Sequence, residues 1–164
     1  MGKTTDSQEP AGNYSRAILN RTLIDLSWAS SHLEGNTYCR LDSRELIEHS
    51  RSEQGKGAIE TQMILNHKSA IELLVENIVT AEFNQYTLIN VHSVLSENLL
   101  PNPADEGRIR QHAVDIGKSV YRPLSVLAQI EGALKLVLNK ASQIDDAFEQ
   151  FFYDGGCASF AAIC

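Results

Sequence analysis

The chain lacks any apolar run of the about 18–20 residues that a membrane-spanning helix needs. Its first 13 residues are polar and also lack the apolar core of a secretory signal peptide. A composition that is 43% hydrophobic is typical of a globular protein, and 164 residues are enough for one domain with a real core. The sequence therefore predicts a cytoplasmic protein with no membrane partner.

Clustered positive charge is also missing. The chain has 14 Lys and Arg against 21 Asp and Glu, which gives a net charge of −7. The densest basic group, Arg108 and Arg110, lies between the acidic Glu106 and Asp115. Because a protein that binds nucleic acid needs clustered Lys and Arg to neutralise phosphates, we expect no nucleic-acid partner.

Cysteine is scarce. The three cysteines, Cys39, Cys157 and Cys164, form no C-x-x-C pair, and no His stands at ligand spacing beside them. We therefore expect free thiols and no metal site.

Helical periodicity is what the sequence does contain, since apolar residues recur at three- and four-residue steps along most of the chain. Asp42 is the expected N-cap of one helix, with Glu45 as its capping-box partner and Leu41 and Leu46 as a hydrophobic staple. These patterns predict an all-α fold. The predicted helices cover residues 14–34, 42–51 and 58–79, and three more begin near Asn84, Pro123 and Ser142.

One segment departs from this periodicity. Val114 and Ile116 alternate with other residues at a period of two, and the Gly-Lys-Ser sequence at 117–119 turns the chain into Val120 and Tyr121. This pattern predicts a small β-hairpin inside an otherwise helical protein.

The end of the first predicted helix carries an unexpected charge. Gly35 is a natural stop, since glycine readily adopts the left-handed conformation that follows a last turn. Glu34 then lies among carbonyls of partial negative charge, where a carboxylate is disfavoured by about 0.3–1 kcal/mol. Either Glu34 is a surface charge offset by His32 or Arg40, or it is a functional carboxylate that points inward with Ser30, four residues earlier. The predicted packing face of this helix consists of Leu19, Leu23, Leu26, Ser30 and Leu33.

Other polar residues have ordinary structural explanations. His92 lies among apolar neighbours and is expected to be a hydrogen-bonded core or boundary histidine. His67 and His112 have no partner at catalytic spacing. Arg108 and Arg110 either bind a phosphate or carboxylate ligand or pair with the acidic residues of their own loop.

The order of these pieces resembles the Fic family, helical enzymes that usually transfer AMP from ATP to hydroxyl side chains. Ser30-x-x-x-Glu34-Gly35 is similar to the family's inhibitory motif, and its place ahead of the core resembles the class with an N-terminal inhibitory helix. The resemblance extends over residues 27–152. The other segments that carry it are 60–68, Val91-His92 with Leu95, the Gly-Arg-Ile-Arg sequence at 107–110, and Val114-x-Ile116 continuing to Tyr121-x-Pro123.

The resemblance implies an all-α Fic-like helical bundle with a small hairpin flap, which uses ATP and magnesium in the complete family member. Glu34 would inhibit by pairing with the second arginine of the family's catalytic motif and blocking the γ-phosphate of ATP. Ser30, Gly35 and Asn36 would accompany it near the nucleotide.

The resemblance also assigns a role to the predicted hairpin. Val114, Ile116 and Tyr121 would lie in the flap over which a target chain docks by strand addition. Plain hairpin packing is the alternative for all three residues. The expected partner is therefore a protein target or the chain itself.

The family's catalytic stretch, His-Pro-Phe-x-x-Gly-Asn-Gly-Arg-x-x-Arg, is absent, since none of the five histidines begins it. In the family the His is the general base, an acidic residue of the stretch holds magnesium, and a loop at a helix N-terminus binds phosphates. The similarity of residues 148–152 would place this stretch just after Tyr153, where the helical pattern stops. We therefore expect an inactive chain, incomplete at its C-terminus and cut short by a frameshift near Tyr153.

These expectations divide the chain into a disordered lead-in (1–13), an inhibitory-helix region (14–56), a partial Fic core (57–153) and an irregular tail (154–164). Apolar faces left bare in an incomplete core favour homo-oligomers. Two alternatives stay open: a non-enzymatic helical interaction or regulatory domain, and an inhibitor of another Fic protein in trans.

Overall fold

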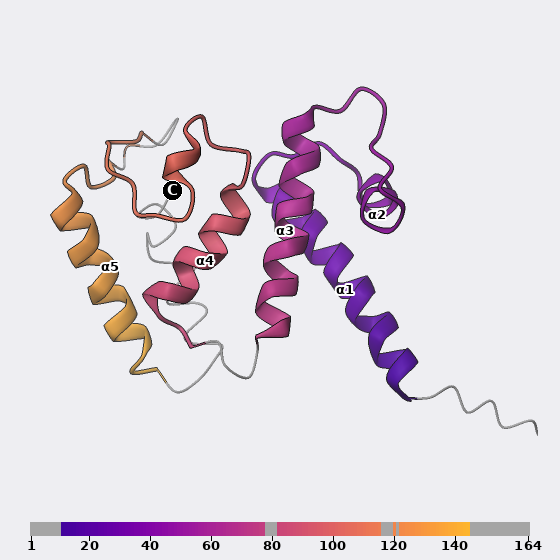
Figure 1. The fold of residues 1–164 in the computed structure, drawn as a ribbon, viewed down its shortest axis with the longest axis horizontal. Helices are drawn as coiled ribbons and strands as arrows, with labels where there is room; N and C mark the ends of the chain where they lie inside the picture. Colours follow the sequence, from indigo (N-terminus) through magenta and orange to yellow (C-terminus); the bar gives the residue numbers. More distant parts are fainter. Residues whose placement is uncertain (1–10, 78–81, 116–119, 121, 145–164) are drawn as a thin grey trace, which may run out of the picture. The chain divides into compact units, whose positions relative to one another are not determined.

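The computed structural model describes residues 11–77, 82–115, 120 and 122–144, and every regular element in these ranges is a helix (Figure 1). The all-α prediction is therefore confirmed for the part of the chain that is described. None of the described helices is long and apolar enough to cross a bilayer. The elements are α1 (Ala11–Leu33), α2 (Arg40–His49), α3 (Ala58–Glu76), α4 (Gln85–Ser96), the 3-10 helix η1 (Pro103–Asp105) and α5 (Leu127–Ala141).

The chain forms two compact units, which divide between Glu72 and Leu73. In the first unit, α1 packs against α2. A small core of Tyr38, Leu46 and Ile64, each at most 4% exposed, joins the α1–α2 connection to α2 and α3. Burying side chains of this size stabilises a fold by about 1.5–3 kcal/mol each, so this core fixes the α1–α2 connection in place.

The predicted packing face of α1 is wrong. Leu33 is 88% exposed and Leu19 is 55% exposed, whereas Ile24, Ser27 and Ser31 are buried. Both serine hydroxyls donate to the carbonyl four residues earlier in the helix, at 2.7 and 2.8 Å. Because both hydroxyls have hydrogen-bond partners within α1, these two small serines can be buried at little cost. The buried face of α1 therefore differs from the leucine-rich face that the apolar pattern predicted.

The predicted N-cap of α2 is also wrong. Cys39 is the N-cap, and its Sγ accepts from the backbone N–H of Asp42 at 3.5 Å. Leu41 is 64% exposed and forms no staple, while Tyr38 is buried in the core with Leu46. Core packing of the residue before the cap therefore places the N-cap at Cys39, three residues ahead of Asp42, and α2 begins at Arg40.

The start of α3 at Ala58 agrees with the prediction, and its expected extension to residue 79 reaches beyond the described residues. The start of α1 at Ala11 precedes the predicted start at Tyr14. Residues 1–10, most of the expected lead-in, lie outside the described part of the chain.

In the second unit α4 packs against α5. Asn84 is confirmed as the N-cap of α4, because its Oδ1 accepts from the N–H of Thr87 at 3.0 Å. α5 begins at Leu127 with Val126 as its N-cap, so Pro123 does not open this helix. Ser142 closes α5 as its C-cap, so the predicted sixth helix does not begin there, and residues 145–164 lie outside the described residues. Ile130, Leu134 and Ala141 of α5 are buried.

Neither Val114 nor Val120, described residues of the predicted hairpin, lies in a strand. Val114 is half-buried in an irregular segment, and Val120 is fully exposed. Ile116, Tyr121 and the turn at 117–119 lie outside the described residues. The fold is therefore all-α where it is described, and the hairpin flap stays a prediction.

Candidate functional site

The end of α1 forms a well-defined helix stop. Gly35 has a φ of +94°, and its N–H donates to the carbonyl of His32 at 3.1 Å. The N–H of Asn36 donates to the carbonyl of Ser31 at 3.0 Å. These two bonds form a Schellman motif, which satisfies carbonyls that the helix end would leave unpaired. The predicted stop at Gly35 is confirmed, and Glu34 follows the last helical residue directly.

Asn36 attaches this helix end to the start of α3. Its side chain is buried, with Nδ2 donating to the carbonyl of Glu60 at 2.7 Å and Oδ1 accepting from the N–H of Tyr38 at 2.9 Å. The carboxylate of Glu60 in turn accepts from the N–H and hydroxyl of Thr37, at 2.9 and 2.6 Å, and these bonds lower its pKa. The residues after Glu34 are therefore fixed to α3.

Glu34 meets a histidine that the sequence did not assign to it. Glu34 Oε1 lies 3.5 Å from Nε2 of His67 on α3, and the Glu34 side chain is 55% exposed. The sequence showed no partner for His67 at catalytic spacing, but the fold brings Glu34, which is distant in sequence, beside it. The site therefore consists of the half-exposed carboxylate of Glu34 beside the buried imidazole of His67.

The other ring nitrogen of His67 is already bonded. Nδ1 lies 2.9 Å from the carbonyl of Met63 and 3.2 Å from Oγ of Ser31. The Ser31 hydroxyl donates to the carbonyl of Ser27, so both neighbours of Nδ1 are acceptors and the ring proton of the neutral form belongs on Nδ1. Nε2 then donates to Glu34 only when His67 is an imidazolium.

Electrostatics favour that charged form. Burial works against the imidazolium, but the hydrogen bonds with Glu34 and Met63 and the charge of Glu34 outweigh it, and the pKa of His67 is raised above its ordinary value of 6.5. The ion pair therefore persists to higher pH than it would with a histidine of ordinary pKa.

Ser30, the predicted companion of Glu34, is not the serine that lines this site. Ser30 is half-buried, and its backbone carbonyl accepts from the N–H of Glu34 at 3.3 Å. Ser31 is the buried serine beside His67. The spacing Ile64, His67, Ala70, which places His67 on the buried stripe of α3, was the available sequence signal for its position.

The second unit holds the other predicted candidates. His92 is buried, and its Nδ1 accepts from the N–H of Gly107 at 3.1 Å, which confirms a hydrogen-bonded structural histidine. Burial lowers the pKa of His92, with the charge of Glu106 acting in the opposite direction. A Cβ on Gly107 would lie 2.8 Å from Cβ of Ser93, so the backbone can approach His92 this closely only with glycine.

The two candidate arginines have structural partners. Arg108 pairs with Asp105, as the loop-pairing interpretation predicts. Arg110 is 4% exposed and donates to the carbonyls of His112 and Leu124, at 3.0 and 2.6 Å. Arg110 thereby ties together two parts of its own unit, and its guanidinium does not face solvent.

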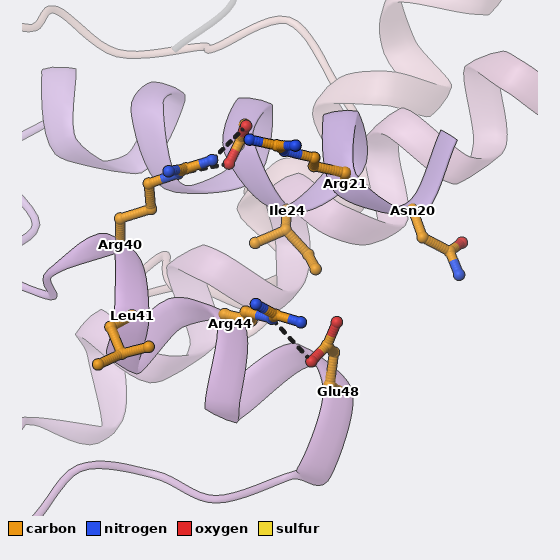
Figure 2. Close-up of a pocket in the computed structure, with 8 residues that line it drawn as sticks. Asn20, Arg21, Ile24, Arg40, Leu41, Arg44 and Glu48 are labelled. Carbon is orange, nitrogen blue, oxygen red and sulfur yellow. Dashed lines mark hydrogen bonds and ion pairs between the residues drawn. The ribbon is translucent and has the colours of Figure 1, made fainter. Parts of the chain in front are cut away.

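A groove of about 780 Å³ lies between α1 and α2 (Figure 2). Three arginines line it, but Arg40 binds both oxygens of Asp25, at 2.6 and 2.7 Å, and Arg44 binds Glu48 at 2.9 Å. Arg21 acts on Asp25 through its charge alone, so the three arginines and the two carboxylates leave the groove with one excess positive charge, which solvent screens. No group of three or more His, Cys, Asp or Glu that could hold a metal ion occurs among the described residues.

These observations define the chain as an all-α protein that holds a half-exposed carboxylate, Glu34, at the end of a helix. Its helices match a crystal structure of a Fic family protein from Desulfovibrio desulfuricans G20, with a TM-score of 0.63, 17% sequence identity and coverage of 78% of this chain. The match covers 38% of that protein, so this chain spans well under half its length. No family model and no curated protein matches the sequence. The described helices therefore have a partial Fic-like fold.

Proposed function

We propose that this chain is the regulatory front part of a Fic-type enzyme that transfers AMP from ATP to protein hydroxyl groups, and that Glu34 is its inhibitory group. The observation that carries the proposal is Glu34 itself, held at the end of α1 with its side chain 55% exposed. The Fic-like fold supports the same assignment. A carboxylate in this position is available to a guanidinium, as inhibition in the Fic family requires.

The residues that follow Glu34 hold its backbone rigidly. The Schellman motif at Gly35 and the buried bonds of Asn36 fix the backbone on the C-terminal side of Glu34. A fixed carboxylate loses less conformational entropy when it pairs with an arginine than a mobile one does. The end of α1 is therefore suited to hold an inhibitory charge in one place.

The chemistry of AMP transfer does not fit the residues of this chain. The described residues offer no metal-binding cluster, and the His-Pro-Phe stretch with its general base is absent from the sequence. We therefore expect this chain to be inactive alone.

Labelled ATP tests this expectation. The purified chain, incubated with α-labelled ATP and magnesium, should label neither itself nor the proteins of a lysate. An active Fic AMP transferase in a parallel reaction shows that the assay works. Magnesium-dependent labelling by the chain would contradict the proposed inactivity.

A second candidate function is inhibition of another Fic protein in trans. The observation that favours it is that Glu34 and the contacts that hold it lie within one compact unit, which ends at Glu72. The test is the AMP transfer rate of a Fic enzyme whose own inhibitory glutamate is replaced by glycine. Inhibition that rises with added chain, and is lost with Glu34→Gly, would favour this candidate over inhibition within one chain.

The proposal keeps two partners that follow from the Fic resemblance. A protein target would dock along Val114, Ile116 and Tyr121. A second copy of the chain would cover exposed apolar residues such as Leu19 and Leu33 of α1. Sedimentation of the purified chain over a range of concentrations distinguishes a monomer from such an oligomer.

A further inference from the structure

His67 is a buried titratable group that the proposed function does not yet use. Its side chain is 10% exposed, and its Nδ1 is bonded within the first unit to Met63 and Ser31. Only Nε2 is left for another partner, and Nε2 faces Oε1 of Glu34 at 3.5 Å. The ring is therefore held on one side and presented to the carboxylate on the other.

We propose that His67 is a positioning residue for Glu34: its imidazolium holds one carboxylate oxygen through Nε2 and leaves the remainder of the carboxylate open to an incoming guanidinium. The proposal deepens the inhibitory role of Glu34 and rests on it. A carboxylate accepts several hydrogen bonds at once, so one imidazolium does not saturate it. The 55% exposure of the Glu34 side chain agrees with this arrangement.

The hold on Glu34 depends on the proton of His67. Glu34 is the charged group that faces the ring from α1, the other α1 neighbour is the neutral Ser31 hydroxyl, and α3 contributes the Met63 carbonyl. No charged side chain of α2 acts on the ring in the described part of the first unit. When His67 loses its proton, the lone pair of Nε2 faces the carboxylate and the attraction is lost. Glu34 is therefore positioned while His67 is protonated and released as His67 deprotonates.

An NMR titration of the full chain tests the pair. The expected result is that Glu34→Gln lowers the pKa of His67, because the opposing charge is removed while the burial remains. The matched control is Glu48→Gln, which removes one carboxylate from the same unit, where it pairs with Arg44 on α2. An unchanged pKa of His67 in Glu34→Gln, or an equal fall in both variants, would overturn the proposal.

A second variant separates positioning from folding. His67→Asn removes Nε2, yet an Asn side chain can still bond the carbonyl four residues earlier, as Asn77, directly after the same helix, does with Leu73 at 2.7 Å. In the wild type, the amide signals of Glu34 and Gly35 should titrate with the midpoint of His67. In a folded His67→Asn variant this transition should be absent. A transition that persists unchanged would show that His67 does not position Glu34.

These measurements need neither ATP nor a catalytic loop, so their outcome is separate from that of the AMP-transfer experiments. If the titration shows the His67–Glu34 pair but Glu34 inhibits AMP transfer neither in trans nor in cis, the proposed function is wrong and the ion pair is a structural contact. If the pKa of His67 does not depend on Glu34, the positioning role is wrong, but Glu34 can still be the inhibitory group.

Discussion

At the scale of single residues, Gly35 determines how the chain leaves α1. Its φ of +94° is a conformation that costs a residue with a Cβ about 1–2 kcal/mol. A Cβ at this position would meet nothing within 4 Å, so the cost of adding one is conformational and not steric. The position of Glu34 therefore depends on the backbone conformation of Gly35 and not on lack of space for a side chain there.

We predict that Gly35→Ala destabilises the first unit by about 1 kcal/mol. The matched control is Gly57→Ala in the same unit, where φ is not left-handed and the new Cβ would lie 3.9 Å from Oε2 of Glu60, an ordinary contact. The control should be neutral or slightly stabilising, because alanine restricts the unfolded chain. Urea unfolding followed by the fluorescence of Trp28, the sole tryptophan, measures both variants in the first unit. Equal effects of the two substitutions would refute the conformational argument.

The sequence predicted some of the site at this scale and missed the rest for a physical reason. The stop at Gly35 and the placement of Glu34 beside it follow from local helix chemistry, which is encoded by adjacent residues. The contact between Glu34 and His67 spans 33 positions and depends on how α1 packs against α3. Helix spacing identified Ser30 as the companion of Glu34, whereas burial places Ser31 there.

At the scale of helices, a cap formed by a residue type that commonly caps helices was predictable, and a cap whose position is set by tertiary packing was not. Asn84 caps α4 as predicted, through a bond to Thr87 three residues on. The N-cap of α2 is Cys39 instead of the predicted Asp42, because Tyr38 is buried in the core. Pro123 was a plausible first residue of a helix, yet α5 begins at Leu127.

We predict that Asn84→Ala destabilises α4 by about 1 kcal/mol, because the N–H of Thr87 loses its side-chain acceptor. Asn84→Asp keeps an acceptor in place and should retain most of the stability. Hydrogen exchange of the amides in Gln85–Ser96 measures the effect locally. Faster exchange in the alanine variant than in the aspartate variant is the expected order, and the reverse order would disprove the capping role.

At the scale of the whole chain, the two units carry histidines that respond to pH in opposite directions. The pKa of His67 is raised, so its stabilising contribution is complete below its ordinary value of 6.5 and is lost as pH rises through the raised value. The pKa of His92 is lowered by burial, so its contribution is complete above 6.5 and is lost as pH falls through the lowered value. His92 must be neutral at Nδ1 to accept from Gly107, whereas His67 must be charged to bind Glu34.

We therefore predict that acidification from pH 8 to pH 5 strengthens the contribution of His67 in the first unit and weakens that of His92 in the second. Hydrogen exchange, corrected for the intrinsic effect of pH on exchange rates, follows each unit separately. Glu34→Gln should remove the gain in the first unit and leave the second unit unchanged. Changes of the same sign in both units would contradict the opposite assignments of the two histidines.

The central claim is that Glu34 is the inhibitory carboxylate of a Fic-type enzyme of which this chain is the front part. The most direct measurement is to sequence the gene across and beyond the codon for Tyr153 and to translate all three frames. The account predicts that one frame continues with the Pro-Phe, acidic, Asn and Arg pattern of the family's catalytic stretch. If no frame encodes this pattern, the claim is wrong, and the chain is a helical interaction or regulatory domain instead.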